Sequence, residues 1–294
     1  MAEAIAIDSD WLSDHPLPLP PEDTDKNARG QVLVAGGCLA VPGGLLLTGE
    51  AALRAGAGKV RLATVRSLAV PLGVAFPEAG LIALPEDGED EVGDVEAPQF
   101  LRPLAQCDCA IVGPAMKGKA AAARVLAAAL DRPREGMTLV IDAAAIAGAG
   151  EARDRISNHR GRVIITPNPG EAASLLEIEL DAVVRDPEGS ARRVVDLTGA
   201  VVTVKGPNTV VATPDGDLLR YSGGGVGLAT GGSGDVQTGI LGGLLALGVA
   251  PCDAATWAVW IHGEAGRRLA EQVGPIGYLA RELLPLIPRL MRAG

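Results

Sequence analysis

The chain has 294 residues, 48% hydrophobic and only 2% aromatic, so it can form one large domain with a mainly aliphatic core. Its formal net charge of −10 argues against a nucleic-acid partner, because proteins that bind nucleic acid usually carry basic surfaces. The sequence shows neither a basic and apolar leader nor an apolar stretch long enough to span a bilayer, so we expect a cytoplasmic protein without a membrane partner.

The cysteines and histidines do not indicate a metal site. The four cysteines are not at zinc-like spacing, and we expect buried thiols rather than a metal site or a disulfide: Cys38, Cys107, Cys109 and Cys252. His262 lies in an apolar helical pattern, which favours a packed residue over a catalyst, and His159 has polar neighbours that predict an exposed side chain.

The first 27 residues predict an N-terminal arm, and residues 28–294 predict one domain. Residues 15–21 are rich in proline, which favours extended polyproline geometry and excludes a helix there. Trp11 would fix this arm to a surface of the same subunit or of another one.

Strands and helices are expected to alternate after the arm. Apolar runs predict strands at residues 31–35, 59–64, 81–84, 107–112, 138–141, 163–165 and 201–204, and a hairpin from 209–213 and 218–221. Helical patterns cover residues 45–55, 120–130, 190–197, 235–248, 253–273 and 278–291. The acidic segment 86–96 is predicted to be a solvated loop. The predicted fold is α/β, a mainly parallel central sheet with helices on both faces.

Ligands of open parallel sheets bind beyond the carboxyl ends of the strands, where several polar residues of this chain are expected to converge. Asp142 follows one predicted strand and is either a helix-capping acid or a functional carboxylate. Glu171 is either a first-turn acid or part of a site for hydrated Mg²⁺. Lys205 follows an apolar strand and precedes a glycine, which favours a phosphate contact over a solvated lysine.

Residues 227–240 are the most informative segment. Four small residues, 231–234, precede Asp235, and an apolar run of helical length follows from residue 240. Small residues at a helix start let backbone N–H groups approach an anion, and a carboxylate beside that anion could take a proton from an attacking hydroxyl. The segment therefore predicts an anion hole with a general base for phosphoryl transfer. The alternative is a glycine-rich turn with Asp235 as an ordinary helix-start acid.

Five motifs in this order resemble the ribokinase-like superfamily and, within it, the ATP- or ADP-dependent NAD(P)H-hydrate dehydratases. They lie at residues 26–37 (KNARGQVLVAGG), 51–58 (AALRAGAG), 166–171 (TPNPGE), 204–209 (VKGPNT) and 229–235 (ATGGSGD). The resemblance covers nearly everything from residue 26 to residue 288. It implies the three-layer ribokinase-like fold.

The resemblance also implies a repair enzyme. Its substrate would be hydrated NADH or NADPH, whose ring hydroxyl receives the terminal phosphoryl group of the nucleotide before phosphate is eliminated. Asp235 would deprotonate that hydroxyl. The resemblance assigns the nucleotide to Lys205, Gly206, Pro207, Asn208, Thr209, Gly232, Ser233 and Gly234, and the hydrated dinucleotide to Gly44, Ala115, Asn168 and Asp235. It further implies Mg²⁺, held weakly by Glu171 through water, and a homo-oligomer.

The substrate end departs from the family pattern. The family commonly has histidine where Asn168 stands, glycine where Ala115 stands, alanine where Gly44 stands and a second aspartate where Ala144 stands. The Asn-x-x-Glu pattern that Asn168 forms is also typical of ribokinase-like kinases. A kinase acting on an alcohol of a sugar, vitamin or pyrimidine is therefore the alternative function, and a nucleotide-binding protein without catalysis is a third one.

Overall fold

Short runs of buried aliphatic residues form the central sheet. The computed structural model describes residues 4–18, 20–21, 23–88, 90–132, 134–159 and 161–292, and in these residues the strand order is β1-β10-β9-β8-β7-β6-β5-β2-β3-β4. The strands are β1 (Ile5–Ala6), β2 (Gln31–Ala35), β3 (Lys59–Val65), β4 (Gly80–Leu84), β5 (Cys109–Val112), β6 (Thr138–Ile141), β7 (Val163–Ile165), β8 (Val201–Val204), β9 (Asn208–Ala212) and β10 (Leu218–Ser222). Every residue of β5, β6 and β7 is buried, as expected of parallel strands that are covered on both faces.

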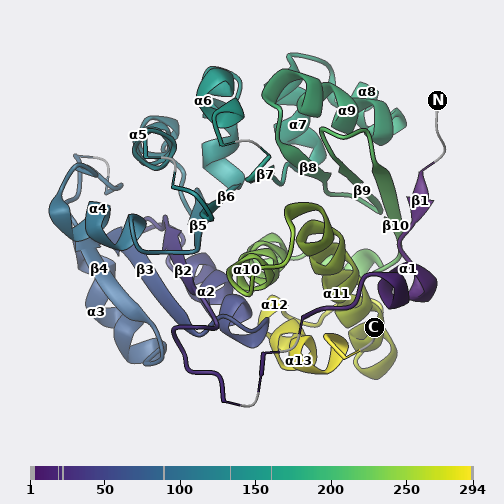
Figure 1. Ribbon diagram of the computed structural model, residues 1–294, viewed down its shortest axis with the longest axis horizontal. Helices are drawn as coiled ribbons and strands as arrows, with labels where there is room; N and C mark the ends of the chain where they lie inside the picture. The colour runs from purple at the N-terminus through teal and green to yellow at the C-terminus, as the bar shows by residue number, and fades with distance from the viewer. Residues whose placement is uncertain are drawn as a thin grey trace.

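Helices cover the sheet on both sides. In Figure 1, α10 and α11 lie on one side with α2 next to α10, and α5 to α9 lie on the other. The longer helices are α2 (Gly43–Arg54), α3 (Arg66–Ala75), α5 (Lys119–Leu130), α9 (Pro187–Thr198), α10 (Ser233–Ala246) and α11 (Pro251–Gln272). The shorter ones are α1 (Ser9–Asp14), α4 (Pro98–Leu104), α6 (Arg153–Ser157), α7 (Pro169–Leu176), α8 (Leu180–Arg185), α12 (Ala280–Leu283) and α13 (Ile287–Leu290), with 3₁₀ turns η1 (Ala143–Gly148), η2 (Val226–Leu228) and η3 (Leu284–Leu286). The predicted α/β fold with a mainly parallel sheet is confirmed.

The N-terminal segment lies on the sheet and helices of its own chain. Strand β1 pairs in parallel with β10 at the sheet edge. Trp11 is buried in α1 and stacks on His15, with 4.2 Å between the ring centroids, and the carbonyl oxygen of His15 accepts a hydrogen bond of 2.7 Å from the indole of Trp257. Trp11 was expected to pack on its own subunit or on another one, and the structure shows it packed within its own subunit.

Several local predictions were wrong. The predicted helix over 278–291 is divided into α12, η3 and α13, because Pro285 and Pro288 occupy first-turn positions of new helical segments. Strand β5 begins at Cys109 rather than Cys107, because the Cys107 amide donates to the Pro103 carbonyl at the end of α4.

Two polar side chains predicted to be solvated are buried. His159 is 0% exposed, its Nε2 lies 3.2 Å from the Leu130 carbonyl oxygen, and burial lowers its pKa. Within the acidic segment 86–96, Glu91 is 4% exposed and its carboxylate binds backbone amides of another loop. Neighbouring residues in the sequence could not reveal either environment, because both depend on segments far along the chain.

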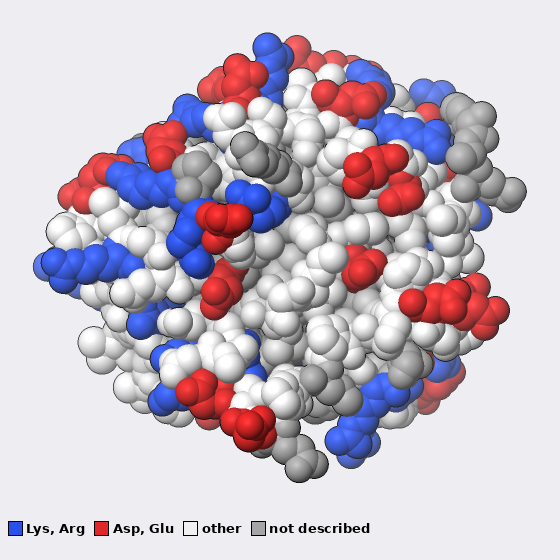
Figure 2. Space-filling model, viewed as in Figure 1, with Lys and Arg blue, Asp and Glu red and all other residues white. Residues whose placement is uncertain are grey.

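The surface charge is mixed. On the face in Figure 2, acidic and basic side chains are interspersed around the margin, while the middle of the face is mostly uncharged. The cysteines are free thiols, three of them buried. None of the described helices combines the length and the apolar character that crossing a bilayer requires.

Glycines in α10 let this helix contact the backbone of α2. A Cβ atom added to Gly239 would lie 2.3 Å from the Thr48 carbonyl oxygen, and one added to Gly243 would lie 2.5 Å from the Ala52 carbonyl oxygen. Neither position can hold a larger residue unless the helices separate. Because α10 starts at Ser233 and α2 starts at Gly43, this contact sets the distance between the two helix starts at the sheet's carboxyl edge.

We expect Gly239→Ala to lower the free energy of unfolding by about 2 kcal/mol, because the added methyl group would collide with backbone atoms of α2. Gly73→Ala is the matched control, since a Cβ atom at this position of α3 would lie 3.4 Å from Leu81, an ordinary contact. Helix propensity predicts that the control is neutral or stabilising by up to about 1 kcal/mol. Urea unfolding of both variants tests the close contact, and equal stabilities would contradict it.

Candidate active site

A cavity of about 960 Å³ opens beyond the carboxyl ends of β6, β7 and β8 and beside the start of α10. Most of the predicted site residues line it: Asn168, Glu171, Lys205, Gly206, Pro207, Asn208, Thr209, Ser233, Gly234 and Asp235. Asp142, Tyr221 and His262 also contribute to its wall. The convergence expected at the carboxyl edge of the sheet is therefore observed for residues that lie up to about a hundred positions apart.

Asp235 lies in the first turn of α10, as the sequence predicted. Gly232 precedes the helix with a φ of 87°, a left-handed conformation that favours glycine. The Ser233 amide donates to the Thr230 carbonyl at 3.3 Å. The next N–H groups of the first turn have no partner within the helix, so this turn presents donors to an anion. Burial and the negative charge of Asp142 raise the pKa of Asp235 to about 6, although the Lys205 ammonium lowers it. A carboxylate with this pKa is ionised at neutral pH and can still accept a proton readily.

Asp142 is a buried charge rather than a helix cap. The structure shows no capping hydrogen bond from its side chain to η1, which excludes the capping alternative. Its Oδ1 accepts from Lys205 Nζ at 2.7 Å and from the Thr166 hydroxyl at 2.7 Å, and its Oδ2 accepts from the Thr238 hydroxyl at 3.0 Å. Asp142 is 3% exposed, so the ion pair fixes the ammonium of Lys205 in a half-buried position at the cavity wall.

Lys205 also lies beside the glycine loop. A Cβ atom added to Gly234 would be 3.6 Å from its Nζ. The cavity therefore has a positioned cation next to the start of α10, in a chain whose net charge is −10. Such a local positive site favours anions despite the acidic background.

The predicted substrate residue Gly44 adjoins the Asp235 carboxylate, and Ala115 adjoins Gly44. A Cβ atom added to Gly44 would lie 2.9 Å from Asp235 Oδ2 and 3.0 Å from the Ala115 Cβ. Ala115 has a φ of 57°, a conformation that glycine adopts more easily. Neither residue belongs to the wall of the large cavity. Asp235 therefore lies between that cavity and the loops that carry Gly44 and Ala115.

Asn168 and Glu171 form a capping box at the start of α7. The Asn168 Oδ1 accepts from the Glu171 amide at 2.9 Å, and Glu171 Oε2 accepts from the Asn168 amide at 2.8 Å. Burial raises the pKa of Glu171, which the hydrogen bond from Asn168 and the charge of Lys205 partly offset. The Asn-x-x-Glu pattern that suggested a kinase thus has a local structural role.

The sequence did not reveal which side chains hydrogen bond to Ser233 and Asp142. His262 Nε2 lies 2.8 Å from the Ser233 hydroxyl, and burial lowers the pKa of His262 to about 4, so the ring is neutral and orients Ser233. This agrees with the prediction of a packed histidine. Thr166 and Thr238 bind Asp142, and Thr238 could have been noticed because it lies one helical turn after Asp235.

Comparisons with known proteins agree on one family. The family model described as NAD(P)H-hydrate dehydratase matches residues 32–289. The ADP-dependent (S)-NAD(P)H-hydrate dehydratase of Xanthomonas campestris pv. campestris is 40% identical over 276 residues, which make up 93% of this chain and 92% of that protein.

A longer relative and a solved structure are also similar. The bifunctional NAD(P)H-hydrate repair enzyme Nnr of Moorella thermoacetica is 33% identical over 94% of this chain, but this chain spans about half of that protein's length (52%). The fold matches a crystal structure of the ADP/ATP-dependent NAD(P)H-hydrate dehydratase of Bacillus subtilis, co-crystallized with ATP/Mg²⁺, with a TM-score of 0.82, 23% identity, and coverage of 99% of this chain and 98% of that one. The extent of the family match and the 40% identity over nearly the whole chain show that this protein belongs to the NAD(P)H-hydrate dehydratase family.

Proposed function

We propose that the chain repairs hydrated NADH or NADPH by nucleotide-dependent dehydration. The observation that supports this most directly is the position of Asp235, between a large cavity with a fixed cation and the loops of Gly44 and Ala115. This arrangement suits two reactants that meet at one carboxylate. The nucleotide would occupy the cavity, and the hydrated nicotinamide ring would lie against Gly44 and Ala115, with Asn168 as a further contact at the cavity wall.

In the first step, Asp235 accepts the proton of the ring hydroxyl while the hydroxyl oxygen attacks the terminal phosphorus of the nucleotide. The bond between that phosphorus and the bridging oxygen breaks, and the shortened nucleotide leaves. The amides of Gly232, Gly234 and Asp235 hold the oxygens of the transferring phosphoryl group, where charge develops. Lys205, which Asp142 holds in place, contributes positive charge to the same group.

In the second step, the ring carbon–oxygen bond breaks and phosphate leaves. Phosphate is a much better leaving group than hydroxide, and the ring nitrogen supplies the electron pair that assists its departure. The adjacent ring carbon then gives up a proton to water, and the electrons of that carbon–hydrogen bond form the double bond that restores the dihydronicotinamide. The bound nucleotide therefore activates a hydroxyl for elimination, and phosphate is released as a product instead of remaining on the substrate.

The donor would be ADP or ATP bound by residues 205–209. This segment turns from β8 into β9 along the cavity wall, where Gly206 and Thr209 hydrogen bond to each other and keep the turn narrow. Among the described residues, no group of three His, Cys, Asp or Glu side chains could hold a metal ion alone. Glu171 lies at the cavity wall, where it could reach a hydrated Mg²⁺ carried by the phosphates through water, and the ion would neutralise phosphate charge.

The organisation of the protein is part of the same proposal. Residues 1–27 would form an arm and residues 28–294 a single catalytic domain that works as a cytoplasmic homo-oligomer with small-molecule substrates. Val70 and Val74 support a contact between subunits, because they lie one turn apart on α3 and are 75% and 80% exposed.

Incubation of the purified protein with hydrated NADH, Mg²⁺ and either ADP or ATP should restore the absorbance of the dihydronicotinamide and release phosphate in equal amount. The two amounts should be equal because each hydroxyl that is phosphorylated leaves as one phosphate and restores one dihydronicotinamide ring. A stable phosphorylated product, or no recovery of absorbance with either nucleotide, would contradict the proposed reaction.

Asp235→Asn should lower kcat about a thousandfold, because it removes the proton acceptor, while the nucleotide still binds. The variant should also be more stable at neutral pH. Burial and Asp142 raise the pKa of Asp235 from its ordinary value of 3.8 to about 6. The folded state therefore loses stability as the pH rises from 3.8 to about 6, the whole loss is present at neutral pH, and asparagine avoids it.

Asp253→Asn is the matched control, because Asp253 also lies in the first turn of a helix, α11. It should leave kcat unchanged. If both variants behave alike in steady-state kinetics, Asp235 is an ordinary helix-start acid.

The pH dependence of kcat/KM should show an acidic limb with an apparent pKa near 6. The raised pKa of Asp235 means that its carboxylate is protonated below this pH and cannot accept the hydroxyl proton, so the rate should fall about tenfold per pH unit. A profile that stays flat down to pH 4.5 would exclude Asp235 as the base.

A further inference from the structure

A second cavity, of about 520 Å³, is lined by none of the residues that line the large cavity. Its wall consists of residues 38–40, which follow β2, of Asp90 and Glu91, and of Lys117 and Gly118, which precede α5. None of these residues was predicted to have a function, and the acidic segment was expected to be a solvated loop. The volume is in the range of cavities that bind small molecules.

Two loops connect this cavity to Asp235. The loop after β2 runs from the cavity wall at residues 38–40 to Gly44, and the loop after β5 runs from Ala115 to Lys117 and Gly118. The Gly37 amide donates to the Pro114 carbonyl at 3.0 Å, so the two loops are in contact. Gly44 and Ala115 adjoin Asp235 at one end of this pair, and the cavity lies at the other end.

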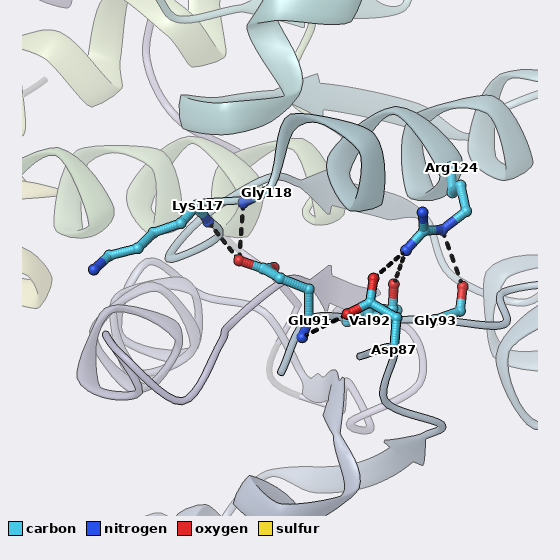
Figure 3. A network of polar contacts seen from close by, with 7 residues as sticks. All are labelled: Asp87, Glu91, Val92, Gly93, Lys117, Gly118 and Arg124. Atoms are coloured by element: carbon cyan, nitrogen blue, oxygen red, sulfur yellow. Dashed lines mark hydrogen bonds and ion pairs between the residues drawn. The ribbon is translucent and has the colours of Figure 1, made fainter. Parts of the chain in front are cut away.

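The wall is held rigidly by Glu91. Its Oε1 accepts hydrogen bonds from the Lys117 amide at 3.0 Å and from the Gly118 amide at 2.8 Å (Figure 3). The segment of Glu91 is fixed in turn, because Arg124 binds Asp87 at 2.6 Å and the carbonyls of Val92 and Gly93. The loop that carries Ala115 is thus anchored to the segment around Glu91.

Two polar groups at this cavity have no partner among the described residues. Glu91 is 4% exposed, and its Oε2 is buried without a hydrogen bond. The Lys117 side chain extends away from Glu91 in Figure 3, and its ammonium forms no ion pair with another described residue. An unpaired acceptor and an unpaired cation at one cavity fit a ligand with hydroxyl donors and negative charge.

We propose that this cavity binds the pyrophosphate and adenosine half of the hydrated dinucleotide, an inference that rests on the proposed function. With the nicotinamide ring at Asp235 and the donor nucleotide in the large cavity, the remaining half of the substrate extends along the two loops. Lys117 binds the pyrophosphate, and the unpaired oxygen of Glu91 accepts a hydrogen bond from a ribose hydroxyl. The site thus distinguishes a dinucleotide from smaller hydrated nicotinamides.

Lys117→Ala should raise KM for hydrated NADH about tenfold, with kcat and the KM of the nucleotide donor within twofold of wild type. Lys119→Ala is the control, because Lys119 is also exposed and only two residues away but lies outside the cavity wall. Equal KM values for hydrated NADH in the two variants would overturn the assignment of Lys117.

Hydrated reduced nicotinamide riboside lacks the pyrophosphate and adenosine. It therefore tests whether the loss in Lys117→Ala depends on that part of the substrate. Lys117→Ala and wild type should dehydrate this truncated substrate with the same kcat/KM. An equal loss on both substrates would overturn the proposal, since it would show a general disturbance of the site. If wild type is inactive with hydrated NADH, the proposed function itself is wrong, whereas an active wild type with an unaffected Lys117→Ala variant removes only this inference.

Glu91→Gln keeps an acceptor for the amides of Lys117 and Gly118 and removes the carboxylate. It should raise KM for hydrated NADH severalfold while the thermal midpoint stays within a few degrees of wild type. An unchanged KM with unchanged stability would contradict the contact between Glu91 and the ribose.

Discussion

The contact between α2 and α10 is the constraint on which the candidate site depends. Backbone atoms of α2 occupy the space that side chains at Gly239 and Gly243 would need, so the two helices approach as closely as their backbones allow. Gly44 lies at the start of one helix and Asp235 at the start of the other, on the same edge of the sheet. In the proposed reaction, helix packing deep in the core would therefore decide whether a ring bound against Gly44 can place its hydroxyl at the Asp235 carboxylate. A shift of about 1 Å at such a junction is enough to lower a rate severely.

Asp142 couples this geometry to electrostatics. It accepts hydrogen bonds from Thr166 after β7, from Lys205 after β8 and from Thr238 in α10. Burial and the negative charge of Asp142 raise the pKa of Asp235, while the ion pair keeps Lys205 at the cavity wall. One buried carboxylate would thereby support both requirements of the proposed phosphoryl transfer, a basic carboxylate for the acceptor and a fixed cation for the donor. A substitution of Asp142 would change both the pKa of Asp235 and the position of Lys205.

The sequence predicted elements best where local pattern and tertiary burial agree. The residues of β6, β7 and β8 form uninterrupted apolar runs between turn signals, and their ends were predicted correctly because both faces are buried. His159 and Glu91 were assigned to solvent because polar neighbours surround them, whereas the groups that bury them belong to distant loops and helices. The same limit applies to the site. Motif order identified the family and the residues that gather around Asp235, but a sequence motif carries no information about the partners of Asp142 or about the second cavity.

The departures from the family pattern acquire a physical meaning from their positions. Ala115 holds a left-handed conformation in which glycine would be free of strain, and its methyl group lies against the space above Gly44. Gly44, where the family often has alanine, has no Cβ atom to occupy that space. The two substitutions are therefore complementary, since a methyl group is added on one loop and removed from the facing one. Their exchange would keep the volume beside the Asp235 carboxylate nearly constant, so under the proposed function the same ring would still fit although the chain departs from the pattern at two positions.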